Sequence, residues 1–338
     1  MANDNIILVV IIVFFFCFCQ FTTTSFSLAY PLVPAIYTFG DSLVDVGNNN
    51  YLLFSLVKAN FPHNGIDFPT KKPTGRFCNG KNAVDLLGVN FASGGSGILN
   101  QTNQKNSLSL TKQVNSFIKV HKALNKQLGP SGLNQHISKS LFVIVTGSND
   151  IFSYFGSAEL RNKTTPSQYI NSMVATFKGQ VERLYNLGAL RFVIVGIGVI
   201  GCTPSQRKSN KAEQCNEEVN SVAIKYNEAL TSTLKSLKVE QKELNYSYFD
   251  GYSVMQNAIQ KPATYGLFEI KAACCGLGKL KADVYCLPVS TVCSNRSSHL
   301  FWDASHPTET AHRIFVDYIF GGPLRFTFPL NVKQLIGT

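Results

Sequence analysis

Three residues of the sequence have the side chains that nucleophilic acyl chemistry requires, namely Ser42, Asp303 and His306. A serine hydroxyl is a poor nucleophile until a neighbouring base takes its proton, and histidine is the most frequent base. Asp303 stands three residues before His306, so its carboxylate can fold back onto the imidazole Nδ1–H and stabilise the imidazolium. The pattern predicts a catalytic triad assembled from two distant segments.

Attack on an acyl group also requires hydrogen-bond donors for the oxygen that becomes negatively charged. We expect three such donors. They are the backbone N–H of Ser42, the backbone N–H of Gly95, which has no side chain to block a close approach, and the side-chain amide of Asn149. The alternative is that Gly95 and Asn149 only turn the chain, because both residue types are common in turns.

Among the six histidines, His306 has the strongest local support as the base. Pro307 suits the first position of a helix, since its φ is fixed and no N–H is left unsatisfied there. That helix would bury one apolar face, made of Ala311, Ile314, Phe315 and Tyr318. We therefore expect His306 at a rigid helix entrance, whereas His312 falls off the apolar face and is predicted to be solvated.

Short strands that alternate with helices would position these residues. Apolar segments rich in β-branched or aromatic residues predict strands over residues 35–39, 89–92, 141–145, 192–195 and 246–249. Apolar residues at helical spacing predict helices over residues 114–124, 170–184 and 219–237. The alternation favours a parallel sheet with helices on both faces, in which functional groups lie at the carboxyl ends of the strands.

The polar segments do follow the predicted strands. Residues 40–42 (GDS) come after the first strand, residues 93–95 (SGG) after the second and residues 147–150 (GSND) after the third. Each segment alone is weak, because a glycine after a strand usually turns the chain. Asp303 alone would be an ordinary charge at a helix N-terminus. Their order and their shared sheet edge carry the prediction.

The N-terminus has the pattern of a targeting segment. Residues 6–19 are an unbroken apolar run of 14 residues, and Ser27-Leu28-Ala29 offers a small-x-small cleavage site. The run is shorter than the ~20 residues of a membrane span. Residues 1–29 are therefore a predicted signal peptide, and we expect a secreted protein without stable membrane insertion after cleavage. Residues 1–5 carry no Lys or Arg, so an uncleaved anchor is the alternative.

Sequons and cysteines fit the secretory route. Predicted glycosylation sites are Asn100, Asn162, Asn245 and Asn295. Seven cysteines follow residue 29, and we expect a disulfide between Cys202 and Cys215. Adjacent cysteines rarely bond to each other, so Cys274 and Cys275 are expected to pair with Cys286 and Cys293 in an unspecified order, leaving Cys78 over. Reduced thiols are the alternative, and zinc is not expected because no Cys-x-x-Cys occurs.

Charge and glycine pattern argue against two other classes of protein. The formal net charge is +11, but the basic residues are scattered, which disfavours nucleic-acid binding and leaves acidic polysaccharide or anionic membrane surfaces as attractive partners. Gly196, Gly198 and Gly201 match a dinucleotide-binding fingerprint. Pro204 stands where the phosphate-binding helix would run, so this match is rejected and no cofactor is predicted.

The segments FGDSLVDVGNNN, VNFASGGSGI, VTGSND and FWDASHPTETAH resemble the four conserved blocks of the plant GDSL lipase/esterase family, within the SGNH-hydrolase superfamily. TGRFCNGK, GCTPSQR and ACCGLG resemble it too, and the similarity runs from Pro34 to Pro329. The resemblance implies a three-layer α/β/α sandwich with a mostly parallel, flavodoxin-like sheet. It implies Ser42 as nucleophile, His306 as base and Asp303 as its orienting partner, with Ser42, Gly95 and Asn149 as oxyanion donors.

The predicted function is hydrolysis of a small-molecule or lipid ester by one domain over residues 30–338. The chain departs from the family at Leu87-Gly88, where a longer helix and loop would normally stand. Apolar surface covered by that segment is expected to be exposed, and the helix that begins at Lys81 is expected to be short. Two alternatives remain: acyl transfer to an alcohol by the same triad, and an inactive secreted binding or defence protein.

Overall fold

A computed structural model describes residues 32–85 and 88–338, and its centre is a six-stranded sheet in the order β10-β5-β4-β3-β1-β2. The strands are β1 Ile36–Gly40, β2 Val89–Asn90, β3 Leu141–Val145, β4 Arg191–Val195, β5 Asn245–Phe249 and β10 Thr327–Pro329. Only β10 pairs antiparallel to its neighbour. The order 2-1-3-4-5 of the parallel strands is that of a flavodoxin-like sheet. The predicted fold class is therefore confirmed.

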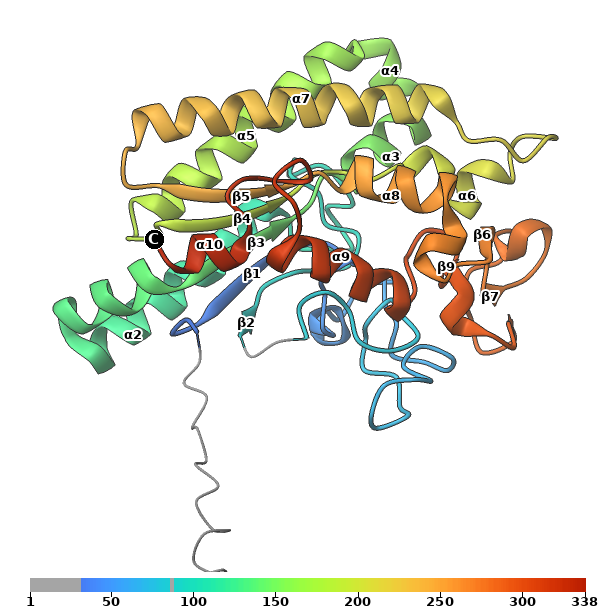
Figure 1. Cartoon of the computed structure of the whole chain (residues 1–338), viewed down its shortest axis with the longest axis horizontal. Coiled ribbons are helices and arrows are strands. Elements are labelled where there is room, and N and C mark those ends of the chain that lie inside the picture. The colour runs from blue at the N-terminus through green and yellow to red at the C-terminus, as the bar shows by residue number, and fades with distance from the viewer. Residues whose placement is uncertain (1–31, 86–87) are drawn as a thin grey trace, which may run out of the picture. The chain divides into compact units, whose positions relative to one another are not determined.

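Helices cover both faces of the sheet (Figure 1). The helices of the first face are α2 Leu110–Lys139, α5 Pro166–Tyr185 and α7 Glu217–Glu240, and those of the second are α9 Glu309–Gly321 and the short α10 Val332–Ile336. Shorter helices connect strands to helices: α3 Ser148–Gly156, α4 Ala158–Lys163, α6 Pro204–Arg207 and α8 Gly251–Gln260. The helices predicted over residues 114–124, 170–184 and 219–237 are present as α2, α5 and α7. Each extends beyond its predicted range, and capping residues outside the apolar pattern begin α5 and α7.

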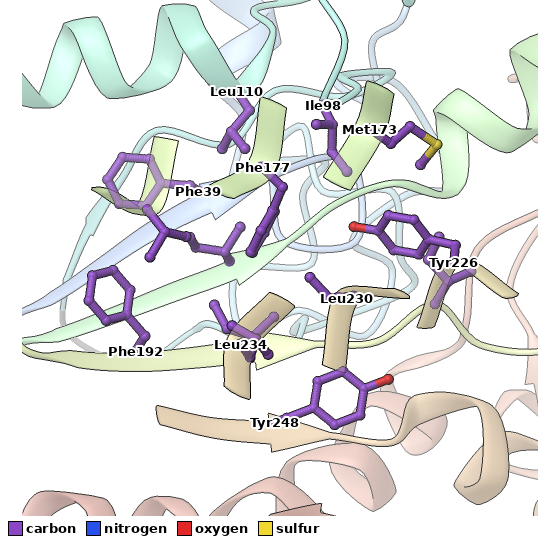
Figure 2. Close-up of a cluster of buried hydrophobic side chains, with 14 of the residues drawn as sticks. Phe39, Ile98, Leu110, Met173, Phe177, Phe192, Tyr226, Leu230, Leu234 and Tyr248 are labelled. Atoms are coloured by element: carbon purple, nitrogen blue, oxygen red, sulfur yellow. The ribbon is translucent and has the colours of Figure 1, made fainter. Parts of the chain in front are cut away.

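The period of two along each strand sends alternate side chains into the two layers. On the first face, large aromatic and aliphatic residues of the strands meet α2, α5 and α7 in one buried cluster, part of which Figure 2 shows around Phe39, Phe177 and Tyr248. On the second face, Leu141 and Val193 pack against Val332 and Leu335 of α10. The first-face cluster is the main core, and it holds the strand ends in fixed register.

Disulfide bonds hold the segments beside the sheet. The structure contains Cys202–Cys215, Cys274–Cys293 and Cys275–Cys286. The adjacent cysteines thus bond to separate downstream partners, as expected. They lie beside two small sheets, β6 Glu269–Ala273 with β9 His299–Phe301 and β7 Cys275–Gly276 with β8 Thr291–Val292. Within the described residues Cys78 is a free, buried thiol.

The predicted helix at Lys81 is wrong. Residues 81–85 form a turn in which Asp85 accepts a hydrogen bond from the Asn82 N–H (2.7 Å) and pairs with Arg76. Five residues ahead of the shortened segment are too few to nucleate a helix without tertiary support. Leu87, at the join itself, lies outside the described residues.

The second face of the sheet holds an apolar cavity of about 150 Å³ beside this turn. Its wall includes Val84, the strand residues Val143 and Val193, and Phe315 of α9. The expectation that the shortened segment leaves apolar surface exposed stays a prediction.

His312 lines the same cavity, and its predicted exposure is wrong. The imidazole is buried, because α9 packs its flank as well as its apolar stripe against the sheet. No described residue forms a hydrogen bond with its side chain. Burial, and then the positive charge of His306, lower the pKa of His312 to about 3.

The buried His312 is expected to make the protein sensitive to acid. In the unfolded chain its pKa returns to about 6.5, so the unfolded state binds a proton that the folded state does not, and stability falls as the pH drops below 6.5. His312→Leu should remove this slope. Between pH 7 and pH 5 the free energy of unfolding of wild type should fall by about 2 kcal/mol more than that of the variant. Urea unfolding at pH 7 and pH 5 measures the free energy of unfolding of wild type and variant. An equal loss in the two proteins would contradict His312 as the source of the acid sensitivity.

Residues Val33–Thr338 group into one compact unit. The predicted signal peptide, residues 1–29, lies outside the described residues. None of the helices within residues 32–85 and 88–338 is long and apolar enough to cross a membrane.

Candidate active site

Ser42 stands in the turn directly after β1, at the carboxyl edge of the sheet. Gly40, the last residue of the strand, has a φ of 152°, and a Cβ at this position would collide with the carbonyl oxygen of Val145 in β3. A glycine is therefore required where β1 lies tight against β3 before the chain turns. The Asp41 carboxylate accepts a hydrogen bond from the Leu43 N–H (3.0 Å), which closes the turn around Ser42.

A continuous chain of hydrogen bonds joins the three predicted triad residues. The His306 Nε2 lies 2.7 Å from the Ser42 Oγ, and its Nδ1 lies 2.8 Å from both carboxylate oxygens of Asp303. Asp303 is itself held in place, since its Oδ1 accepts hydrogen bonds from the backbone N–H groups of Ser305 and His306 (2.9 Å each). The structure thus brings together residues separated by 264 positions, in the arrangement that general-base activation of a serine requires.

The charges of this buried pair support each other. Burial alone would raise the pKa of Asp303, but the His306 charge and the hydrogen bonds it receives outweigh burial and hold the pKa below its usual value. For His306, burial alone would lower the pKa, but the Asp303 charge and hydrogen bond, with a smaller contribution from Asp41, raise it. The ring of Phe77 packs over the imidazole at 5.0 Å between centroids and limits its rotation.

The position of His306 differs from the prediction. The helix α9 begins at Glu309, and Thr308 is its N-cap, whose side chain accepts a hydrogen bond from the Ala311 N–H. Pro307 therefore precedes the helix and forms a bridge with Phe301 in β9 instead of occupying the first helical position. His306 lies in the loop between β9 and α9, and the Asp303 hydrogen bonds fix it there.

The three predicted oxyanion donors line one cavity of about 670 Å³ together with the triad. The backbone N–H groups of Ser42 and Gly95 have no acceptor among the described residues. Asn149 donates one amide hydrogen to the Ser96 carbonyl (3.0 Å), which fixes the amide and leaves its second hydrogen for a ligand. A Cβ at Gly95 would meet no close neighbour, so lack of space does not explain the glycine. Its φ of 78° does, because this backbone conformation favours glycine.

Buried polar residues that the sequence did not single out hold these segments together. Gln113 in α2 accepts from the Gly40 N–H and donates to the Gly40 carbonyl (2.8 Å each). Asp45 accepts from the Gly94 N–H (2.8 Å), and Asp150 accepts from the Ile98 and Leu99 N–H groups (2.8 and 3.0 Å). Gln113 lies one residue before the predicted helix 114–124 and four positions before the apolar Phe117, and this helical spacing of a polar residue was the available signal for such a role.

Asp41 is an unusual neighbour of the triad. It is fully buried, its Oδ2 has no hydrogen-bond partner among the described residues, and burial raises its pKa to about 7, against the Leu43 hydrogen bond. It lines the same cavity as Ser42. The remainder of the cavity wall is mainly apolar and includes Phe152, Ile200, Phe249, Met255 and Phe315. The cavity therefore combines one polar cluster with space for an apolar group.

The predicted glycosylation sites lie away from this cavity. Asn100, Asn162 and Asn295 are exposed. Asn245 begins β5 and is only partly exposed, its side chain accepting a hydrogen bond from Lys238 (3.0 Å).

Comparisons with known proteins indicate the family to which the chain is similar. The sequence model of the family described as GDSL-like Lipase/Acylhydrolase matches residues 36–319. The chain is 46% identical to GDSL esterase/lipase At5g55050 of Arabidopsis thaliana, over 90% of each chain. It is 36% identical to GDSL esterase/lipase At4g16230 of the same plant, over 91% of this chain and 92% of the relative. It is 34% identical to GDSL esterase/lipase 7 of Arabidopsis thaliana, over 90% of this chain and 92% of the relative.

Proposed function

The chain belongs to the GDSL-like lipase/acylhydrolase family and is a hydrolase that acts on ester bonds. From this premise we propose that it is a secreted serine esterase and that Ser42, His306 and Asp303 form its catalytic triad. The observation that carries the proposal is the unbroken hydrogen-bond chain from Asp303 through His306 to the Ser42 hydroxyl, beside a cavity that can hold the ester.

The first half of the reaction forms an acyl-enzyme. The Ser42 Oγ attacks the ester carbonyl carbon while its proton moves to the His306 Nε2, and Asp303 stabilises the imidazolium. The N–H groups of Ser42, Gly95 and Asn149 donate to the carbonyl oxygen as it becomes negative. The intermediate then collapses: the bond from carbon to the leaving oxygen breaks, and His306 returns the proton to the departing alcohol.

The second half repeats these steps with water. His306 takes a proton from a water molecule, whose oxygen attacks the acyl carbon, and the same three donors hold the second oxyanion. The bond to the Ser42 Oγ then breaks, the serine recovers its proton from His306, and a carboxylic acid leaves. The apolar wall of the cavity suits the hydrocarbon part of the ester, which keeps the ester carbonyl as the polar group that the donors contact.

Activity should depend on pH through His306. The imidazole is a base only when neutral, and Asp303 keeps its pKa above 6.5. The profile of kcat/KM should therefore rise with pH along an acid limb whose midpoint lies above 6.5. Asp303→Asn removes the negative charge that raises the pKa of His306 most, while burial still lowers that pKa. The midpoint of the acid limb should therefore move to lower pH in this weakly active variant. An unmoved midpoint would show that another group controls the limb.

Two alternatives use the same fold, and product analysis separates them. Turnover of a short-chain aryl ester by the purified protein is expected and would be absent from an inactive binding or defence protein. Adding an alcohol tests acyl transfer, since a transferase would form a new ester where a hydrolase releases the free acid. Predominant ester formation at low alcohol concentration would replace the hydrolase proposal with the transferase one.

Secretion belongs to the same proposal. Its support is the N-terminal apolar run, the disulfides, and the exposed sequons at Asn100, Asn162 and Asn295. Glycosylation at these asparagines, and cleavage after Ala29, would appear in the intact mass of protein recovered from the medium. Protein found only inside the cells that produce it, with no glycan, would overturn this part.

A further inference from the structure

In the loop that follows residues 40–43, large apolar side chains are exposed to solvent, whereas the polar side chain of Ser55 is buried. Tyr51, Leu53, Phe54 and Leu56 have between 87% and 89% of their surface exposed, whereas Ser55 in their midst is 6% exposed. This is the reverse of what stabilises a protein surface in water, and groups of exposed large apolar residues mark sites of interaction. We call Tyr51 to Leu56 the first ridge.

Hydrogen bonds hold the first ridge in this conformation. The Ser55 Oγ donates to the Asn106 carbonyl (2.6 Å), and the Leu56 N–H donates to the Asn106 Oδ1 (3.2 Å). The Asn49 amide donates to the Val57 carbonyl (2.8 Å), which fixes the end of the loop. The polar groups of the loop are thus used internally, and the outward direction of its apolar side chains follows from this bonding.

A second group of exposed apolar residues, Tyr285 to Val289, also borders the active-site cavity, and we call it the second ridge. Tyr285 and Val289 are 63% and 74% exposed, and Leu287 between them is exposed as well. The Cys275–Cys286 disulfide fastens this ridge to the small sheet. The His63 Nε2 lies 3.2 Å from the Pro288 carbonyl, which links the second ridge to the segment that follows the first.

Both ridges belong to the rim of the catalytic cavity. Leu56 of the first ridge and Tyr285 and Leu287 of the second line the cavity that contains Ser42 and His306. Exposed apolar groups of two separate segments therefore border the cavity that an ester must enter.

The charge around the ridges suits a membrane surface. Residues 46–66, 98–112 and 284–295 contain no Asp or Glu. They do contain Lys58, Lys105 and Lys112, and Lys105 is exposed next to the residue that anchors the first ridge. Phosphate headgroups therefore meet no negative charge on these segments, and the lysines attract them.

We propose that the two ridges dock this enzyme on a phospholipid surface, so that the catalytic cavity opens directly onto esters held in the lipid layer. Aromatic and aliphatic side chains that flank a basic surface are what binds a protein to the interface of a bilayer without spanning it. The inference rests on the proposed function for what the cavity does, and it narrows the substrate to water-insoluble esters. The docking itself is measurable without turnover.

Vesicle flotation of protein recovered from the medium tests the docking. Every sample carries Ser42→Ala, so that hydrolysis cannot alter the vesicles, and the vesicles are phosphatidylcholine with and without phosphatidylglycerol. The test variant adds Leu53→Asp and Phe54→Asp, two ridge residues that do not line the cavity. The control adds Val239→Asp on α7, an aliphatic residue that is 78% exposed and lies outside both ridges.

The Ser42→Ala protein and the Val239→Asp control should float with the vesicles, more strongly when phosphatidylglycerol is present. The ridge variant should bind at least about tenfold more weakly, because two large side chains no longer leave water. Equal flotation of the ridge variant and the control would overturn the proposal. So would a change from dimer to monomer in the ridge variant by sedimentation without lipid, since the ridges would then join two copies of the chain.

Turnover of a soluble aryl ester separates this inference from the proposed function. With Ser42 restored, the ridge variant should hydrolyse the soluble ester as wild type does and lose activity only on esters in vesicles. Wild type that floats but hydrolyses no ester would defeat the proposed function and leave docking intact. Wild type that hydrolyses the soluble ester without floating would defeat the docking alone.

Discussion

Ser42→Ala is expected to lower kcat for ester hydrolysis by ~10⁴–10⁶, because it removes the only hydroxyl bonded to the His306 Nε2 among the described residues. His306→Ala should cost nearly as much, and the double variant little more than either single one, since nucleophile and base act as one unit. Steady-state rates on a short-chain aryl ester measure all three. The non-additivity is as informative as the size of the loss, because independent groups would multiply their effects.

Ser205→Ala is the matched control for this loss. Ser205 lines the same cavity, but its hydroxyl contacts Thr203 and Ser305 and not His306. Its removal should change kcat by less than about tenfold, as expected for a hydroxyl in the cavity that lies outside the reacting unit. If Ser42→Ala kept more than about a tenth of wild-type activity, a different nucleophile would be at work.

Replacing Asn149 is expected to give the second-largest effect. Its amide is fixed by the bond to Ser96, and its free hydrogen is needed only when charge develops on the carbonyl oxygen. Asn149→Ala should lower kcat by ~10²–10³ and leave KM nearly unchanged, which is the usual cost of one lost oxyanion donor. Asn149→Asp should be worse, because an ionised carboxylate donates nothing and repels the oxyanion.

Thermal melts serve as the folding control for both Asn149 variants. A turn residue would tolerate alanine or aspartate with an effect on stability but none on kcat. Equal kcat in wild type and both variants would therefore mean that Asn149 only shapes the first turn of α3. The catalytic proposal would then depend on Ser42 and His306 alone.

The parts of the fold that could be predicted are those controlled by local pattern. The strand β3 matches the apolar run at 141–145, and the helix α5 matches the helical spacing of apolar residues at 170–184. Both could be predicted because burial of one or two faces of an element gives its apolar residues a characteristic spacing in the sequence. The polar segments that follow the strands were informative for a different reason, which is the geometry of a parallel sheet. Parallel strands end at one edge, so their following residues meet there whatever the loops between them do.

What the sequence missed depends on contacts between distant segments. His312 is polar and off the apolar stripe of α9, yet the sheet beneath it is broad enough to bury it, and no local pattern records that width. The N-terminus of α9 falls at Glu309 because Thr308 provides the cap while Pro307 is drawn into a bridge with β9. Gln113 is a polar residue whose partner, Gly40, lies 73 positions away, so its role appears only after folding.

Gly95 shows that a residue can be predicted for an incomplete reason. The absence of a side chain was expected to allow a ligand to approach, but space for a Cβ is present, and the positive φ is what favours glycine. Backbone dihedrals are set by the turn after β2 and by the Asn103 amide that donates to the Gly95 carbonyl (2.8 Å). A substitution here would act through the direction of the N–H and not through a clash.

The central claim is that Ser42 is an activated nucleophile, and covalent labelling tests it most directly. A fluorophosphonate transfers its phosphonyl group to an activated serine with loss of fluoride, and the adduct mimics the tetrahedral intermediate. We expect one label per molecule of wild-type protein, located by mass spectrometry on the peptide that contains Ser42, and none in Ser42→Ala or His306→Ala. A label on another residue, or equal labelling of wild type and Ser42→Ala, would contradict the account.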